Sequence, residues 1–259
     1  MKVVIFAGGL GTRISEETEA RPKPMVEIGG KPIIWHIMKI YSHYGFNDFI
    51  ICLGYKGHMI KEYFMNYFLY NSDVTVDIAN NKMSVLGSNS ENFKVTLVDT
   101  GANTKTAGRL KRVQKYIGND DFMLTYGDGV SDVNIAELLK FHESHKKIAT
   151  VTAIQLEARF GGMEINRDDI VYSFKEKSKD EGKWVNGGFF VLGPDVFNYL
   201  PQDTDEIMWE DEPLEKLAEA GELAAYRHYG FWKPMDALRD KLELESLWKN
   251  EKAPWKIWK

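Results

Sequence analysis

The sequence predicts an α/β fold, a Rossmann-like and mostly parallel sheet flanked by helices, and three observations lead to it. Short, continuous apolar runs such as residues 2–7 and 48–54 have the length and composition of strands buried on both faces. Segments with apolar residues at helical spacing, such as residues 32–45, lie between them. A glycine-rich turn follows the first strand. Such alternation favours a parallel sheet that binds ligands at the carboxyl ends of its strands.

The first 150 residues alternate between expected strands and helices. The expected strands are residues 2–7, 48–54, 73–78, 93–101 and 121–129. The expected helices are residues 32–45, 57–68, 108–117 and 134–145. In the second helix, an aromatic stripe has the spacing of a core-facing surface and is expected to be core packing. It consists of Tyr63, Phe64, Tyr67 and Phe68.

After residue 150 the long helices disappear, and the sequence predicts a smaller mixed β region. Its expected strands are residues 149–156, 162–165, 170–176 and 185–192. A short helix at 210–221, a strand at 222–228 and a helix beginning near Asp236 follow. Because no repeat or low-complexity linker interrupts the chain, we expect a single domain, residues 1–259, with lobes at about 1–150 and 151–259.

Composition excludes several functional classes. Lys and Arg together number 33 and Asp and Glu 38, so the net charge of -5 gives no field that would attract a nucleic acid. The single cysteine, Cys52, lies in an apolar strand and is expected to be a buried hydrophobic residue. Neither a secretory signal nor an apolar run of ~18 residues occurs. We therefore expect a soluble, cytoplasmic protein without a membrane or nucleic-acid partner.

The glycine-rich turn "AGGLGTR" at residues 7–13 exposes backbone N–H groups that can wrap a phosphate. It is not a dinucleotide fingerprint, because Ile14 stands where the third glycine belongs. It is not a Walker A loop either, because the nearest candidate has Met25 and Pro32 at required glycine and hydroxyl positions. The phosphate hypothesis thus depends on what surrounds the turn.

A long polar connection follows the turn and carries Arg13, Arg21, Lys23 and Lys31. Loops of this length in compact domains are usually functional or mobile. Basic side chains beside exposed backbone donors suit a polyphosphate. The alternative is a solvated surface loop whose charges do nothing.

Two aspartates are candidate ligands of a divalent metal. Asp128 stands between glycines in "YGDG" at the end of an apolar strand, where a turn-forming role is the alternative. Asp236 follows a proline and starts a helix, where a capping role is the alternative. Mg²⁺ is usually held by one or two carboxylates together with substrate phosphates. The pair therefore predicts a magnesium site.

Five motifs together resemble the sugar nucleotidyltransferases, most closely the glucose-1-phosphate cytidylyltransferase family. They are "GGLGTR", "RPKPMVEIGGKPI", "YGDG", "NGGFF" and "GFWKPMD", and the resemblance runs from end to end of the chain. The first two are common to the whole superfamily. Only "VDTG" with "GRLKRV", and "GFWKPMD", are similar to the cytidylyl branch in particular, and only these favour CTP.

The resemblance implies a role for each matching residue. Arg13, Lys23, Asp128 and Asp236 form the catalytic group, in which the two aspartates bind Mg²⁺. Arg109 is a nucleotide residue by resemblance, with a solvated helix start as the structural alternative. The nucleotide is expected to contact Phe6, Ala7, Gly8, Gly9, Leu10, Gly11, Thr12, Arg13, Lys23, Thr104, Arg109 and Gly127.

The first lobe is then the nucleotide-binding lobe and the second the sugar-binding and C-terminal lobe. The resemblance implies that the sugar phosphate contacts Gly162, Glu176, Lys177, Asn186, Gly187 and Gly188. One departure is Ser178, which stands where the family pattern Glu-Lys-Pro has proline. Because proline fixes the backbone, this change leaves the placement of the sugar phosphate open.

The implied reaction joins CTP and glucose 1-phosphate to give CDP-glucose and pyrophosphate, which the resemblance places in the supply of dideoxy sugars for bacterial surface polysaccharide. Alternatives are the same chemistry with UTP or dTTP, and a non-catalytic sugar-nucleotide sensor. The resemblance also implies a homo-oligomer, with a hexamer as one form. Trp248, Trp255 and Trp258 are expected to dock on the body of the protein or on another subunit.

Overall fold

The computed structural model describes residues 1–155, 162–165, 171–175 and 184–258. Within these ranges, eight strands form one central mixed sheet. One of them, β15 (Leu223–His228), pairs with β10 and stands outside the linear strand order. The remaining order across the sheet is β13 (Val185–Asn186), β10 (Ala149–Ile154), β14 (Phe190–Leu192), β8 (Phe122–Tyr126), β1 (Lys2–Ala7), β4 (Asp48–Leu53) and β7 (Lys94–Asp99). Strands β7, β4, β1 and β8 run parallel, which confirms the predicted Rossmann-like sheet.

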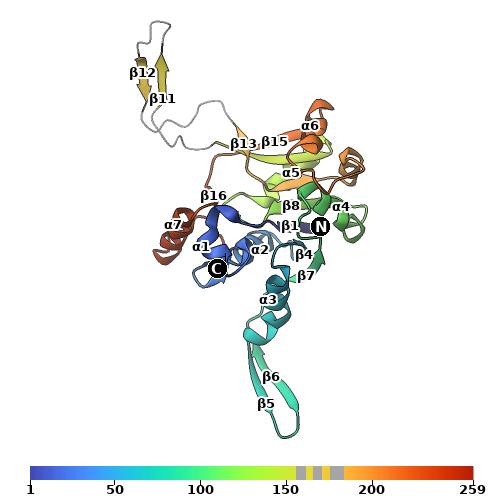
Figure 1. Cartoon of the computed structure of the whole chain (residues 1–259), viewed down its shortest axis with the longest axis vertical. Helices are drawn as coiled ribbons and strands as arrows, with labels where there is room; N and C mark the ends of the chain where they lie inside the picture. Colours follow the sequence, from blue (N-terminus) through green and yellow to red (C-terminus); the bar gives the residue numbers. More distant parts are fainter. Residues whose placement is uncertain (156–161, 166–170, 176–183, 259) are drawn as a thin grey trace.

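Helices cover both faces of this sheet (Figure 1), which explains why its central strands β1 and β4 are apolar after their first residue. Along β1, Val3 and Ile5 join a core that includes α2 (Ile33–His43). Val4 points the other way, into a core that includes α4 (Thr106–Ile117). Because successive strand residues face opposite sides, every position of a doubly covered strand needs an apolar side chain.

The second half of the chain extends the same sheet instead of building a separate one. β14 is antiparallel to β8, and β10 is antiparallel to β14, so the mixed region expected after residue 150 is present. α6 (Glu212–Glu219) precedes β15, which runs parallel to β10. The strands expected at 162–165 and 170–176 correspond to β11 (Gly162–Ile165) and β12 (Val171–Lys175), which pair with each other.

The strand expected at 73–78 was assigned wrongly to the parallel sheet. It is β5 (Ser72–Asp77), which pairs with β6 (Lys82–Ser88) in a separate hairpin beyond the end of α3 (Gly57–Tyr70) (Figure 1). The third parallel strand is β7 instead. The difference is visible in the pattern, because "DVTVD" alternates polar and apolar residues, whereas strands buried on both faces are continuously apolar.

This hairpin presents an apolar face to solvent. Val74 opposes Val85 and Val76 opposes Met83 across the two strands, so all four share one face, and all four are exposed. Ile78 at the turn is 88% exposed. An isolated two-stranded hairpin is at best marginally stable in water. These exposed side chains make one face of the hairpin apolar.

The aromatic stripe of α3 is core packing only in part, which corrects the expectation for this helix. Tyr63, Phe64 and Tyr67 are half-buried and contact one another at ring-centroid distances of 5.1 to 6.4 Å. Phe68 is 48% exposed. The helix lies at the edge of the molecule, next to the hairpin, and therefore has less of the body to pack against (Figure 1).

The C-terminal tryptophans dock on the body of the protein. Trp255 is fully buried, and its Nε1–H donates to Nδ1 of His36 at 3.4 Å. The rings of Trp248 and His36 are 4.7 Å apart and meet edge to face. Trp258 meets Trp35 in the same way at 5.8 Å. His36 on α2 is thus enclosed by tryptophans from the far end of the chain.

Two further expectations concern single features. Cys52 is buried and carries a free thiol, as predicted. Burial raises the pKa of this thiol to about 12, which keeps it protonated and unreactive. None of the described helices is both long enough and apolar enough to span a bilayer.

Candidate active site

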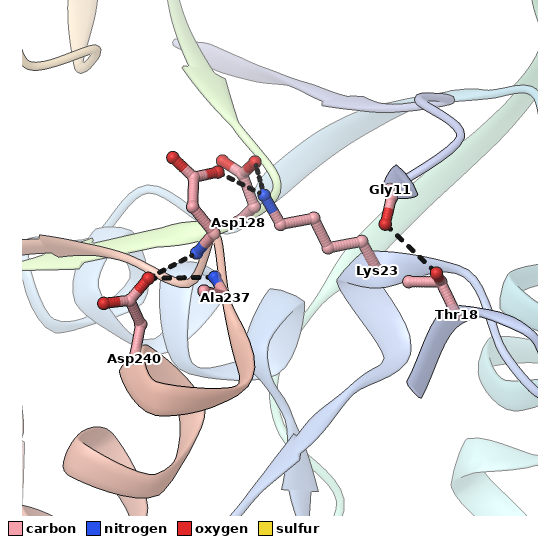
Figure 2. A network of polar contacts seen from close by, with 7 residues as sticks. Gly11, Thr18, Lys23, Asp128, Ala237 and Asp240 are labelled. Atoms are coloured by element: carbon pink, nitrogen blue, oxygen red, sulfur yellow. Dashed lines mark hydrogen bonds and ion pairs between the residues drawn. The ribbon is translucent and has the colours of Figure 1, made fainter. Parts of the chain in front are cut away.

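The glycine turn leaves the carboxyl end of β1 and is held by side chains from two other segments. Gly8 is buried against Arg109, and a Cβ at Gly8 would lie 2.2 Å from the guanidinium carbon. Gly11 has a φ of +67°, a conformation that favours glycine. Thr18 Oγ1 donates to the carbonyl oxygen of Gly11 at 3.1 Å (Figure 2). Gly9 and Leu10, at the tip, are exposed.

Arg109 holds three strand ends together. Its buried guanidinium donates to the carbonyl oxygens of Leu53 at 2.9 Å, Gly101 at 2.9 Å and Gly8 at 3.0 Å, and to Thr100 Oγ1 at 2.7 Å. These residues follow or end β4, β7 and β1. Burial lowers the pKa of Arg109. The solvated helix start, which was the structural alternative, is therefore wrong.

Two other residues expected at the nucleotide lie close by. The Thr104 hydroxyl is buried and accepts a hydrogen bond from Arg112 at 2.8 Å. The N–H of Gly127 donates to the carbonyl oxygen of Phe6 at 2.9 Å, and a Cβ at Gly127 would lie 2.7 Å from that oxygen. Phe6, Gly8, Thr104 and Gly127 thus gather at one edge of the sheet, as expected for a ligand site there.

Asp128 and Asp236 converge on the ammonium group of Lys23, and Figure 2 shows this group beside Asp128. Lys23 Nζ lies 2.8 Å from Oδ2 of Asp128 and 2.7 Å from Oδ1 of Asp236. The lysine side chain is 11% exposed, whereas the two carboxylates are 34% and 35% exposed. The ion pairs are thus enclosed on the lysine side and open to solvent on the carboxylate side.

A short strand pair explains this convergence. Asp128 lies between β8 and β9 (Gly129–Ser131), and β9 pairs antiparallel with β16 (Trp232–Pro234). Gly129 faces Pro234 in this register, and the N–H of Met235 donates to the carbonyl oxygen of Asp128 at 2.8 Å. The backbone pairing alone therefore places the two aspartates side by side, whatever contacts their side chains make.

Asp236 does not cap the helix that follows, so the capping alternative is wrong. α7 (Leu238–Lys249) has Ala237 as its N-cap, and the carboxylate that accepts from the N–H of this N-cap residue belongs to Asp240. Asp240 Oδ2 accepts from the N–H of Asp236 at 3.1 Å and from that of Ala237 at 2.9 Å (Figure 2). This leaves the Asp236 carboxylate directed at Lys23.

The electrostatics keep Lys23 charged. Burial acts to lower the pKa of Lys23, but the charges of Asp128 and Asp236 and their hydrogen bonds outweigh it, so the pKa is raised. Two carboxylates thus share this one ammonium group.

The pair also has the chemistry of a magnesium site. Mg²⁺ prefers oxygen ligands and commonly uses one or two carboxylates, completing its shell with water and substrate phosphates. Asp128 and Asp236 supply two such carboxylates within reach of one point. In the described part of the chain, no group of three or more His, Cys, Asp or Glu residues is placed to hold a metal. The residues present fit a metal that is shared with a phosphate ligand.

The other basic residues of the loop have separate positions. Arg21 pairs with Glu27 at 2.9 Å on the surface, and Lys31 Nζ lies 3.5 Å from Asn71 Oδ1. In these contacts, neither Arg21 nor Lys31 reaches the carboxylates of Asp128 and Asp236. The structure gives the backbone of Arg13, in a 3₁₀ helix at Thr12–Ile14 directly after the glycine turn. Its role stays a prediction.

On the expected sugar side, the Asn186 turn is fixed by three hydrogen bonds. Asn186 Oδ1 accepts from the N–H of Gly188 at 2.8 Å, and Trp232 Nε1–H donates to the carbonyl oxygen of Gly187 at 2.7 Å. The N–H of Gly187 donates to Thr152 at 2.8 Å. The N–H groups of both glycines are thus already bonded, and the Asn186 amide helps to hold the turn.

Two residues that sequence reasoning missed orient that amide. Asn186 Nδ2 donates to the Tyr126 hydroxyl at 3.1 Å, and this hydroxyl in turn hydrogen-bonds to Glu210. Burial and the Glu210 charge raise the pKa of Tyr126. Tyr126 stands two residues before Asp128 in "YGDG", so its place at the edge of the sheet was available from the sequence.

The remaining expected sugar residues are described only in part. Gly162 begins β11. Glu176, Lys177 and Ser178, the residue at the position where the family pattern has proline, lie outside the described residues. Their roles stay predictions.

The chain matches known proteins along most or all of its length. The family model "Nucleotidyl transferase" matches residues 2–249. The chain is 58% identical over 259 residues to the glucose-1-phosphate cytidylyltransferases of Salmonella typhimurium and Salmonella typhi, with 100% of both chains covered in each case.

Solved structures with the same fold have low sequence identity. HddC from Yersinia pseudotuberculosis has a TM-score of 0.69 at 24% identity, covering 95% of this chain and 99% of that chain. Apo UDP-glucose pyrophosphorylase has a TM-score of 0.68 at 19% identity, covering 97% and 99%. With a family model that spans nearly the whole sequence and full-length relatives at 58% identity, the chain belongs to the nucleotidyl transferase family.

Proposed function

We propose that the protein is a glucose-1-phosphate cytidylyltransferase, which transfers a cytidylyl group from CTP to glucose 1-phosphate and releases pyrophosphate. The observation that carries the proposal is the convergence of Asp128, Asp236 and Lys23 at the carboxyl edge of the sheet. This group lies beside a glycine turn of the kind that binds phosphates. The full-length relatives in Salmonella bear the same name.

The reaction needs positioning and charge neutralisation more than proton transfer. A phosphate oxygen of glucose 1-phosphate attacks the α-phosphorus of CTP, and the bond from this phosphorus to the oxygen bridging to the β-phosphorus breaks. The electron pair leaves with pyrophosphate. Because the attacking oxygen is already ionised, no general base is required. Holding two reactants in line supplies up to ~7 to 11 kcal/mol.

Each part of the site has a proposed task. The turn formed by Gly8, Gly9 and Gly11 binds the triphosphate through its backbone, with Arg109 fixing the position of Gly8. Lys23 and Arg13 neutralise the charge that develops on pyrophosphate. On the second lobe, Asn186 binds the sugar, together with Glu176, Lys177 and Gly162 as the family resemblance implies.

Asp128 and Asp236 would hold Mg²⁺, which supplies charge neutralisation on the phosphates when bound. This proposal is supported by the two carboxylates, which meet at one point. Chelation with EDTA is expected to abolish turnover, and added Mg²⁺ to restore it. Full activity after removal of divalent metal would contradict it.

We further propose that residues 1–150 form the nucleotide-binding lobe and residues 151–259 the sugar-binding and C-terminal lobe of one domain, and that the protein works in the cytoplasm as a homo-oligomer, a hexamer being one form. The exposed apolar face of the β5–β6 hairpin supports an assembly. The product would serve the synthesis of dideoxy sugars for lipopolysaccharide O antigen.

Base specificity is the decisive test. Purified protein is given glucose 1-phosphate, Mg²⁺ and CTP, UTP or dTTP in turn, and pyrophosphate release is measured. We expect turnover with CTP to be much the fastest. Equal or faster turnover with UTP or dTTP would contradict the assignment of CTP. Binding of CDP-glucose without any turnover would instead indicate a non-catalytic sensor.

A further inference from the structure

Lys23 occupies the point at which the two proposed metal ligands meet. Its Nζ lies within 2.8 Å of one oxygen of Asp128 and one of Asp236. Mg²⁺ would take its oxygen ligands at about 2.1 Å. A metal ion that used both of these oxygens would meet the ammonium group, and one that used the other oxygens would still lie close to a like charge. The lysine and the metal therefore compete.

Lys23 is built to stay at this point. It opens a 3₁₀ helix (Lys23–Met25) between Pro22 and Pro24, and its carbonyl oxygen accepts from the N–H of Val26 at 3.1 Å. Its side chain is nearly buried, so the two carboxylates replace the water that would otherwise solvate the ammonium group. Removing it from both partners without a replacement anion would leave a buried, unpaired charge.

A replacement anion would arrive beside the same side chain. A Cβ at Gly11 would lie 3.2 Å from Lys23 Cβ, so the side chain of Lys23 begins beside the glycine turn and ends at the two carboxylates. A triphosphate in that turn would thus be adjacent to the ammonium group and could exchange with the carboxylates as its partner. Its oxygens would also complete the metal shell that two aspartates leave unfilled.

We propose that Lys23 is a resident counter-ion that excludes free divalent metal from Asp128 and Asp236 until a triphosphate ligand draws it away. The metal then enters together with the nucleotide and not before it. This inference rests on the proposed metal site. It adds an order of loading that the proposed function does not require.

Metal binding without substrates tests the inference. Binding of Mn²⁺, which also suits carboxylate ligands, is measured by electron paramagnetic resonance on nucleotide-free protein. Lys23→Met is expected to bind Mn²⁺ at least about tenfold more tightly than the wild type, because a competing charge is gone. Lys23→Arg, which keeps the charge, should remain as weak as the wild type.

Two further variants control for a nonspecific effect of removing a lysine and for misfolding of Lys23→Met. Lys39→Met removes a lysine that pairs with Glu91 instead and should leave Mn²⁺ binding unchanged. Lys23→Gln repeats the test with a polar side chain if Lys23→Met does not fold by circular dichroism. Mn²⁺ binding by folded Lys23→Met or Lys23→Gln that is no tighter than wild type would overturn the inference.

The double variant Lys23→Met/Asp128→Asn distinguishes this inference from the proposed metal site. Loss of the gained Mn²⁺ affinity in the double variant supports both proposals. If the double variant binds Mn²⁺ as tightly as Lys23→Met alone, the metal lies elsewhere, and the assignment of Asp128 as its ligand fails as well. CDP-glucose formation is measured separately, so the transferase assignment stands or falls on its own assay.

Discussion

The N–H of Met235 donates to the carbonyl oxygen of Asp128 at 2.8 Å, in the first step beyond the β9–β16 pair. This single backbone contact places Asp236 next to Asp128, although the two aspartates come from opposite halves of the chain. The relative position of the two aspartates is therefore set by the register of this strand pair.

Asp128→Asn should leave the protein folded while lowering turnover by about 100-fold or more, since loss of a direct metal ligand costs more than loss of a supporting contact. The amide keeps the shape of the side chain and removes its charge. Pyrophosphate release at saturating CTP measures the effect, and thermal melting controls for folding. A folded variant with wild-type turnover would remove Asp128 from the metal site.

Asp240→Ala should act through Asp236. The substitution removes the acceptor for the N–H groups of Asp236 and Ala237, so we expect a loss of stability of about 1 kcal/mol together with reduced turnover. Asp240→Asn retains an acceptor and should lose less of both. Leu242→Ala, on the exposed side of the same helix, is the control. Unfolding in urea and turnover are measured for all three, and unchanged values for Asp240→Ala would exclude a positioning role.

His36 should make stability depend on pH. Its ring is buried among tryptophans, and burial lowers its pKa from 6.5 to about 4. Because the unfolded chain binds the proton more readily, stability from this group is complete above pH 6.5 and falls as the pH drops toward 4, by roughly 3 kcal/mol in all.

Urea unfolding of the wild type and of His36→Gln across this range measures that contribution. The variant should be less stable at pH 7.5 but should lose less further stability on acidification. Parallel pH profiles for the two proteins would show that His36 takes up no proton on unfolding.

The β5–β6 hairpin should mediate the proposed assembly. Val76→Asp places a charge on the exposed apolar face, where Val76 is 60% exposed and opposes Met83. Sedimentation velocity should then show smaller species than the wild type. Thr75→Asp, on the opposite face of the same strand, is the matched control and should keep the wild-type assembly. An identical size distribution for all three proteins would show that this face takes no part in the assembly.

The sequence predicted most of the sheet because strands buried on both faces have an unmistakable apolar pattern. It misplaced residues 73–78, where the alternation of Asp73, Val74, Thr75 and Val76 indicates a strand with only one apolar face. The apolar spacing of α3 likewise predicted burial, but spacing alone does not tell whether the body of the protein extends over that face.

For the candidate site, the sequence predicted that Asp128 and Asp236 come together at a metal, but not that Lys23 contacts both carboxylates. Their convergence depends on the β9–β16 pairing, whose strands are too short to leave a pattern. Asp240 was missed because an acidic residue in the first turn of a helix is common, and only the structure shows which N–H groups it serves. The partners of Arg109 are carbonyl oxygens, and carbonyl oxygens have no signature in a sequence.

The position of Asp236 late in the chain has a consequence for biosynthesis. A ribosome makes the glycine turn, Lys23 and Asp128 well before the second carboxylate leaves the exit tunnel. Until then, Lys23 has only one of its two acidic partners. The proposed catalytic group can thus be completed only after translation has passed residue 236, and a shorter nascent chain lacks one of the two proposed metal ligands.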